Sequence, residues 1–222
     1  MWMENKMNDK NINKNSNQYG RSMIEMLGVL AIVGVLSVGG IAGYSKAMEK
    51  FKINKTIDEI SHIVANVRTL YAQQTTYSGL WDLTAIQMGV IPDSLTTSSS
   101  WPYITNSFGG NVLISLNSKH SLFEIDYRGL NKSACVALAS YDWGDRSSTG
   151  LIGVAMSNSH VYSADFYDNP WTLSATVKEK GCYTSEGGGA QVTCIGQQIP
   201  LSSAASICNC EDNMCSISLL YQ

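Results

Sequence analysis

Six cysteines are the residues of this chain whose side chains could form covalent cross-links. They are Cys135, Cys182, Cys194, Cys208, Cys210 and Cys215. An even number of cysteines, none of them in the first 134 residues, favours disulfides formed in an oxidising compartment. Zinc is the alternative, but the last three cysteines follow a C-x-C-x4-C spacing and lack the C-x2-C pair of zinc sites. We therefore predict disulfides and no metal.

Spacing favours one local pair among these cysteines. Cys182 and Cys194 are twelve residues apart across a glycine-rich segment, and closing such a loop contributes about 3 kcal/mol in the chain-entropy model. Cys135 would then pair with one of the three cysteines near the C-terminus, and the other two would pair together. Cys210 with Cys215 is the simplest choice for that last pair. The sequence leaves the connectivity open among fifteen arrangements.

A second candidate is an acid at the edge of an apolar run. Glu25 precedes residues 26–45, which contain no charged residue. Twenty helical residues reach about 30 Å, the thickness of a bilayer's hydrocarbon core, so residues 26–45 are predicted to span a membrane. A carboxylate at the edge of a span is costly unless it is paired, which makes Glu25 a candidate functional residue. The alternative is an interfacial acid on an ordinary membrane anchor.

The remaining polar residues form no catalytic or metal-binding set. Acids at 141–147 and 211–213 do not follow the spacing of a calcium-binding loop, and the glycines at 187–189 do not open a helix after a strand. No metal or triad motif includes any of the three histidines, His62, His120 and His160. The sequence therefore predicts neither an enzyme nor a cofactor site.

Charge and composition narrow the classes of partner. The net charge is −3 and charged residues make up only 15% of the chain, against roughly 25% in typical soluble domains. A chain so close to neutrality has no electrostatic reason to bind nucleic acid. Its serine, threonine, asparagine and glycine content suits the weakly charged surface of an exported protein.

A long helix is predicted to position these residues. No proline occurs from residue 21 to residue 76, and spacings of three and four residues define an amphipathic stripe after the apolar run. The stripe consists of Ile53, Ile57, Ile60, Val64, Val67 and Tyr71. The polar residues expected on the other faces are Lys52, Lys55, Asp58, Glu59 and Arg68. We predict one helix from about residue 22 to about residue 76, its second half packed on a globular head. A coiled-coil stalk is the alternative, but the stripe lasts only about three heptads.

The head is predicted to mix short helices with strands. Residues 80–95 favour a short helix, residues 96–110 a loop, and residues 129–141 a small helix carrying Cys135. The alternating runs predict strands. They are a hairpin of 111–116 with 121–127, a second hairpin of 151–156 with 160–164, and a final strand in 215–222.

The N-terminal pattern resembles the type III signal of prepilins. Gly20, Glu25 and the run MLGVLAIVGVLSVGGIAGY carry the resemblance. It implies that a membrane aspartyl peptidase cuts after Gly20 and methylates the new N-terminus at Arg21. It also implies that Glu25 docks the subunit into a filament. Arg21 departs from the family, in which this position is usually phenylalanine, methionine or another apolar residue.

The flanking segments resemble type IVb pilins in particular. The leader, residues 1–19, is long and polar and has no apolar core of a secretory peptide. The order of short helix, loop and hairpin over residues 79–127 is similar to the head of these pilins. The resemblance implies a disulfide from Cys135 toward the C-terminal region.

These patterns together predict an α+β pilin fold, with a long N-terminal helix packed on an antiparallel sheet. The predicted parts are a cytoplasmic leader at 1–20, the helix at 21–76 with its span at 26–45, and a periplasmic or extracellular head at 77–222. The resemblance implies a single-span inner-membrane precursor with a cytoplasmic N-terminus that assembles into an extracellular pilus. The implied partners are copies of itself, membrane lipid, a prepilin peptidase, an assembly ATPase and a platform protein.

Two other functions compete with a pilus subunit. One is a pseudopilin of a type II secretion system or a minor pilin, which primes a fibre without forming its bulk. The other is a membrane-anchored extracytoplasmic binding module with no role in assembly. The sequence does not distinguish adhesion, conjugation, DNA uptake and motility as the role of the filament.

Overall fold

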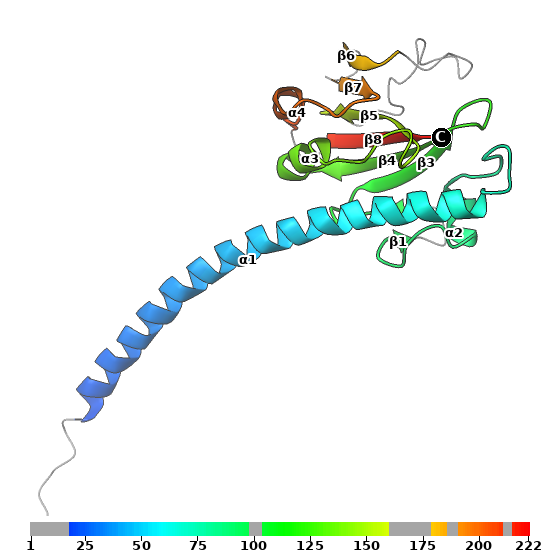
Figure 1. Ribbon diagram of the computed structural model, residues 1–222. Helices are drawn as coiled ribbons and strands as arrows, with labels where there is room; N and C mark the ends of the chain where they lie inside the picture. Colours follow the sequence, from blue (N-terminus) through cyan, green and yellow to red (C-terminus); the bar gives the residue numbers. More distant parts are fainter. Residues whose placement is uncertain (1–17, 98–103, 160–178, 186–190, 211–214) are drawn as a thin grey trace, which may run out of the picture. The chain divides into compact units, whose positions relative to one another are not determined.

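The computed structural model describes residues 18–97, 104–159, 179–185, 191–210 and 215–222. The chain forms two compact units, which divide between Met48 and Glu49. In the first unit, the described residues all belong to one helix. The second unit, called the head unit below, contains the rest of that helix, a sheet and three shorter helices (Figure 1).

The long helix, α1 (Gln18–Leu70), has 53 residues. The prediction of one long helix is confirmed, but its expected end near residue 76 is wrong. The amide of Tyr71 still donates to the carbonyl of Val67 at 3.0 Å, and no residue of 73–76 belongs to the helix. These four residues are exposed and carry no apolar side chain, so another helical turn would bury nothing to offset its conformational entropy.

Within the head unit, α1 buries one face against the sheet. The predicted stripe is confirmed at Ile53, Ile60, Val64 and Val67, which are buried. The stripe's other members are partly buried against the same core. Figure 1 shows this part of α1, in cyan, running beside the strands. Packing an apolar stripe on a sheet supplies the stability that such a helix lacks by itself in water.

Eight strands form one sheet in the head unit. They are β1 (Thr96–Thr97), β2 (Ile104–Thr105), β3 (Asn111–Leu116), β4 (Phe123–Leu130), β5 (Leu151–Ser157), β6 (Gly181–Ser185), β7 (Gln191–Ile195) and β8 (Cys215–Tyr221). Their order is β1-β2-β3-β4-β8-β5-β7-β6, and every neighbouring pair is antiparallel. The predicted α+β class is therefore confirmed.

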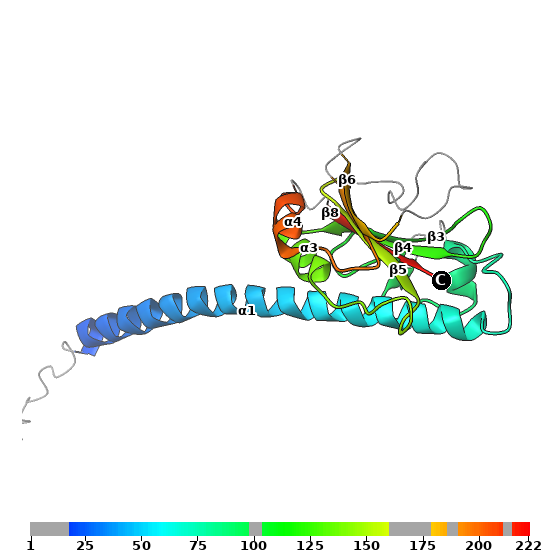
Figure 2. The same cartoon turned by 45° about the horizontal axis from the view of Figure 1, so that its top comes forward.

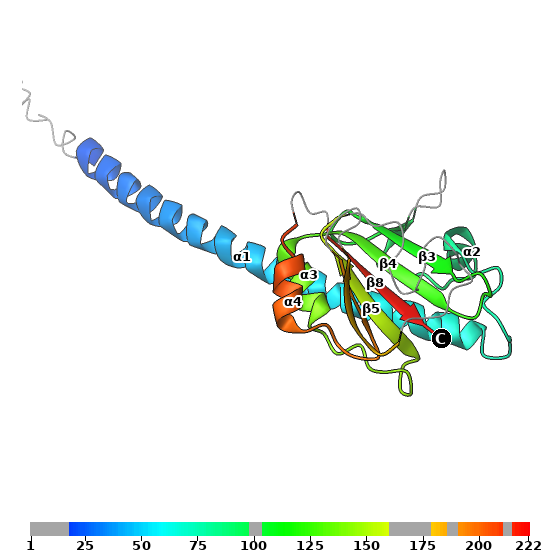
Figure 3. The ribbon, with the colours of Figure 1, turned by 90° about the horizontal axis from the view of Figure 1, so that it is seen from above.

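The C-terminal strand lies inside the sheet and not at its edge. β8 pairs with β4 on one side and with β5 on the other, as Figure 3 shows for the red strand. All seven residues of β8 are buried. The predicted hairpin of β3 with β4 and the predicted final strand are both confirmed.

Two predictions for the strands need correction, and two strands were not predicted. The segment 96–110, expected to be a loop, contributes the short strands β1 and β2. The first strand of the second hairpin is β5, but its partners are β8 and β7, and residues 160–164 lie outside the described residues. Strands β6 and β7 were not predicted, because glycine, serine and cysteine around them mask the alternation that identifies strands.

Among its described residues, the head unit also contains three short helices. They are α2 (Asp82–Gln87), α3 (Lys132–Ala139) and α4 (Leu201–Ile207). Helix α3 begins later than the predicted residue 129 because β4 continues to Leu130. The side chain of Asn131 then caps the helix by accepting a hydrogen bond from the amide of Ala134 at 2.8 Å. Helices α3 and α4 lie side by side at one end of the sheet (Figure 2). That neighbourhood brings their cysteines together.

Candidate functional site

The first functional feature is an apolar helix surface with no covering. From Met23 to Tyr44 the large apolar side chains of α1 are 52–76% exposed, and they occur on all sides of the helix. Within the described residues this is the one helix long and apolar enough to cross a membrane, and its most apolar window has a mean hydropathy of 2.2. A surface of this kind is far larger than the apolar patches of soluble monomers, so it requires lipid or protein around it.

The predicted cleavage and assembly residues lie at the start of this helix. Gly20, Arg21 and Glu25 all belong to α1, and the Glu25 side chain is exposed. Glu25 is the only charged residue between Met23 and Ser45. The first unit therefore presents one carboxylate directly before the uncharged run of residues 26–45.

The six cysteines lie in the head unit and form three disulfides. Cys182 joins Cys194 across the antiparallel strands β6 and β7, where the two residues are directly opposite each other with a Cα–Cα distance of 4.1 Å. This register follows from the hairpin, because facing residues of adjacent strands have neighbouring Cβ atoms. The disulfide therefore ties two neighbouring strands at the edge of the sheet.

The other two disulfides involve α3, α4 and β8. Cys135 on α3 is bonded to Cys208 at the end of α4, with a Cα–Cα distance of 5.7 Å and a sequence separation of 73 residues. Cys210 is bonded to Cys215, the first residue of β8. The sequence left the connectivity open among fifteen arrangements, and the pairing in the structure is the one in which Cys210–Cys215, the simplest last pair, leaves Cys208 for Cys135. This pairing results from α3 and α4 packing together.

A buried polar group joins α1 to the rest of the head unit. Glu59, which was expected on a face other than the apolar stripe, is only 2% exposed, so the buried part of α1 extends beyond that stripe. Its Oε1 atom accepts a hydrogen bond from Ser94 Oγ at 2.9 Å, and Lys55 Nζ lies 3.7 Å from the same oxygen. Lys55 also donates to the carbonyl of Ser94 at 3.0 Å. These contacts hold residue 94 against α1.

Two other oxygen atoms at this position are less well hydrogen-bonded. Glu59 Oε2 and Tyr127 Oη are buried and neither atom makes a hydrogen bond of good geometry within the described residues, although the two side chains interact with each other. Burial raises the pKa of Glu59, and the hydrogen bond from Ser94 and the charge of Lys55 offset this only in part. Burial and the nearby Glu59 also raise the pKa of Tyr127 well above its ordinary value.

The neighbours of Glu59 on α1 show how far the buried face of the helix extends. Glu59 is three residues after Thr56 and four before Ile63, and both of those side chains are fully buried in the structure. Spacings of three and four residues place side chains on the same helix face. The apolar stripe was therefore wider than the predicted set, and it included an acid.

The raised pKa of Glu59 predicts how the stability of the head unit depends on pH. A carboxyl group whose pKa is higher in the folded state binds more protons there, so it stabilises the fold most below its unfolded pKa of about 4.5. This stabilisation is lost as pH rises through the folded pKa. We expect Glu59→Gln to abolish that decline in the free energy of unfolding, measured by denaturant titration of the full chain in detergent.

A neighbouring acid provides the control for this experiment. Asp58 is exposed on the same turn of α1, so Asp58→Asn should retain the wild-type decline. A Glu59→Gln protein whose stability follows the wild-type pH curve would contradict the assigned role of burial.

The sequence of this chain is similar to those of known proteins. Residues 50–166, just over half of the chain, match the protein family described as PilS N terminal. The chain is also 28% identical over 141 residues to the major structural subunit of bundle-forming pilus of Escherichia coli O111:H-, covering 63% of this chain and 72% of that protein. The subunit of the same name from Escherichia coli O127:H6 (strain E2348/69 / EPEC) has the same identity and coverage. With its long apolar helix and antiparallel sheet, the chain belongs to the PilS N-terminal family and is a type IVb pilin-like protein.

Proposed function

We propose that this protein is a structural subunit of a type IV pilus-like filament. The observation that carries the proposal is the bare apolar surface from Met23 to Tyr44, on a helix that continues into the head unit. In many copies, such helices can bury their apolar surfaces against each other while the heads remain in water. The relatives named as major structural subunits of bundle-forming pilus support this function.

Assembly of this kind needs a source of work. Burying apolar surface contributes about 25 cal/mol per Å² relative to water. Relative to lipid the gain largely disappears, because hydrocarbon chains are as apolar as the helix surface. An assembly ATPase and an inner-membrane platform protein are therefore the proposed partners that extract subunits from the bilayer.

The proposed orientation puts the head outside the cytoplasm. All six cysteines belong to the head unit and are bonded in pairs, and disulfides persist in oxidising compartments. The leader would remain in the cytoplasm, with residues 26–45 in the inner membrane. The assembled filament would be extracellular.

The proposal includes processing at the start of α1. We expect a prepilin peptidase to cleave between Gly20 and Arg21 and to methylate the amino group of Arg21. Mass spectrometry of the mature protein, purified from cells with an active prepilin peptidase, checks both modifications. Gly20→Val, which places a β-branched side chain at the scissile bond, should retain residues 1–20. Retention of these residues in the wild type would contradict the proposed processing.

Filament formation is tested directly by shearing cells and imaging the released material with an antibody against the head. A bulk subunit should be the main protein of the sheared fibres, and deleting its gene should remove them. Labelling restricted to rare points on fibres of another protein would instead identify a minor pilin. A protein that remains in the membrane fraction while no fibre forms would favour the membrane-anchored binding module.

A further inference from the structure

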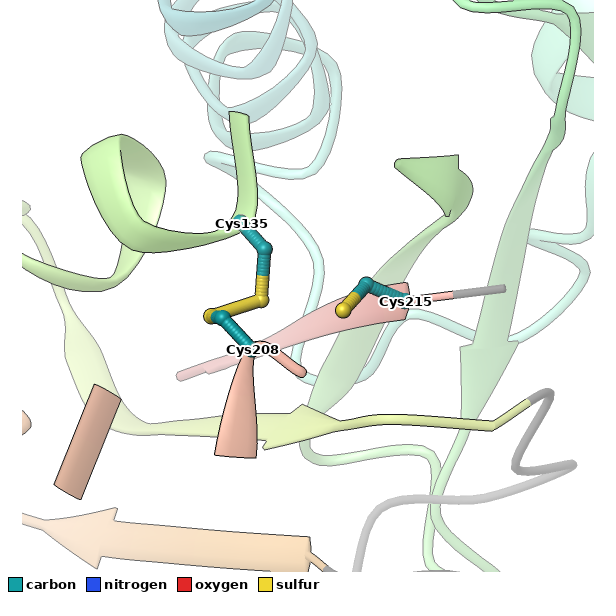
Figure 4. A group of neighbouring side chains, drawn as sticks. All are labelled: Cys135, Cys208 and Cys215. Atoms are coloured by element: carbon teal, nitrogen blue, oxygen red, sulfur yellow. A yellow bond between two sulfur atoms is a disulfide. The ribbon is translucent and has the colours of Figure 1, made fainter. Parts of the chain in front are cut away.

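Two disulfides of the head unit share one buried cluster of sulfur atoms. The Sγ atoms of Cys135, Cys208 and Cys215 all lie within 4.8 Å of one another, and all three residues are fully buried. Figure 4 shows the Cys215 sulfur beside the Cys135–Cys208 disulfide. We call these three residues together with Cys210, the partner of Cys215, the sulfur cluster.

Whether the sulfur atoms are thiolates or disulfide-bonded decides which chemistry this cluster can perform. A zinc ion requires thiolates, and a sulfur in a disulfide is not a thiolate. Thiol–disulfide exchange instead requires a thiolate within reach of a disulfide sulfur. Cys215 satisfies this condition toward the bond between Cys135 and Cys208 as soon as its own bond to Cys210 opens.

We propose that the sulfur cluster is a thiol–disulfide exchange site, which an external thiolate enters at Cys210. Of the four cysteines, Cys210 alone is only partly buried, whereas the other three are fully buried. Cys210 is therefore the one residue of the four with exposed surface from which a thiolate can approach its sulfur. The partner class is a thiol–disulfide oxidoreductase or a small thiol such as glutathione.

The exchange proceeds without net oxidation. The external thiolate attacks Cys210 Sγ, which breaks the bond to Cys215 and forms a mixed disulfide at Cys210. The released Cys215 thiolate attacks Cys135 Sγ and expels Cys208 as a thiolate. Cys208 then attacks Cys210 Sγ and regenerates the external thiolate. Two disulfides are thus exchanged for two others, Cys135–Cys215 and Cys208–Cys210.

The exchange preserves the connection between α3 and the C-terminal segment. Before it, Cys135 is tied to the end of α4, and after it to the start of β8. Both partners already lie next to Cys135 in the folded head unit, so forming the Cys135–Cys215 bond requires no large movement of the backbone. An oxidoreductase could therefore correct the pairing of this cluster after the head has folded.

Peptide mapping of the wild-type protein tests the exchange. The full chain in detergent is incubated with reduced glutathione, blocked with a thiol reagent, and cut after glutamate, including at Glu211 in the sequence. In the observed pairing, the peptides of Cys135 and of Cys215 are both bonded to the middle peptide, residues 187–211, which also carries Cys194 and is therefore bonded to the peptide of Cys182 as well. Exchange gives the middle peptide an internal Cys208–Cys210 disulfide, leaves it bonded only to the Cys182 peptide, and joins the peptides of Cys135 and Cys215 to each other. Absence of the joined pair at every glutathione concentration would overturn the proposal.

A variant removes the need for an added thiol. In Cys208→Ser, the Cys135 thiol faces the Cys210–Cys215 bond directly, so we expect Cys135–Cys215 to form as the main product and Cys210 to become the labelled thiol. The control is Cys182→Ser, at the β6–β7 disulfide, which should leave Cys194 as the labelled thiol and the cluster unchanged. Labelling of Cys135 in folded Cys208→Ser, with Cys210–Cys215 retained, would refute the exchange site. Circular dichroism checks that the variant is folded.

Discussion

Replacing Glu25 with alanine is expected to reduce the amount of sheared filament about tenfold or more, with normal membrane insertion and a folded head. In the proposed filament, the carboxylate neutralises the amino group of Arg21 on a neighbouring subunit. Removing one partner of a buried ion pair typically costs about 3–5 kcal/mol, and each 1.4 kcal/mol is about a factor of ten in association. Glu25→Gln should also reduce the amount of filament, because a neutral amide does not compensate the positive charge of the Arg21 amino group.

The pairing also defines which register of neighbouring helices is favoured, since one axial stagger brings the two charges together. Shear fractions and electron microscopy measure the yield and length of the filaments. Asp58→Ala is the matched control, because it removes an exposed acid from the same helix outside the apolar segment. Wild-type numbers of filaments in cells expressing Glu25→Ala would rule out the pairing role and leave Glu25 as an interfacial acid.

The second large effect is expected at Cys135. We expect Cys135→Ser to lower the free energy of unfolding of the head by about 4 kcal/mol, because the Cys135–Cys208 bond closes the longest loop of the three disulfides, with a sequence separation of 73 residues. The loss is a large fraction of the stability of an ordinary domain. Denaturant titration of the full chain in detergent under oxidising conditions measures it.

Two comparisons separate loop closure from local packing at this position. With an added reductant that opens all three disulfides, Cys135→Ser and the wild type should converge, since neither then has a closed loop. Cys208→Ser should lose less stability than Cys135→Ser if Cys215 replaces the missing partner in the sulfur cluster. Equal stability of Cys135→Ser and the wild type under oxidising conditions would refute the contribution of this disulfide.

Local patterns in the sequence were sufficient to predict the helices and strands that depend only on residues close together in the chain. The uncharged run after Glu25 and the stripe from Ile53 to Val67 predicted α1, because a helix repeats its faces every 3.6 residues. Alternation predicted the hairpin of β3 and β4 and the strand β8 in the same way. Strands β6 and β7 escaped prediction because glycine, serine and cysteine do not produce a clear apolar alternation.

The tertiary structure decided every feature that depends on residues far apart in the chain. Sequence spacing identified Cys135 as a residue to be tied to the C-terminal region, but the packing of α3 against α4 made Cys208 its partner. Spacing likewise could not place β8 between β4 and β5, since strand order depends on long-range pairing.

The same limit applies to the buried acid of α1. Glu59 was expected on a face of α1 other than the apolar stripe, and it is buried because Ser94 and Tyr127 come from other parts of the head to lie against it. Helical periodicity depends only on the residues of one segment, so the chain by itself determined where α1 would form. Burial and disulfide pairing depend on which segments become neighbours in space, and that was determined only when the sheet and helices packed together.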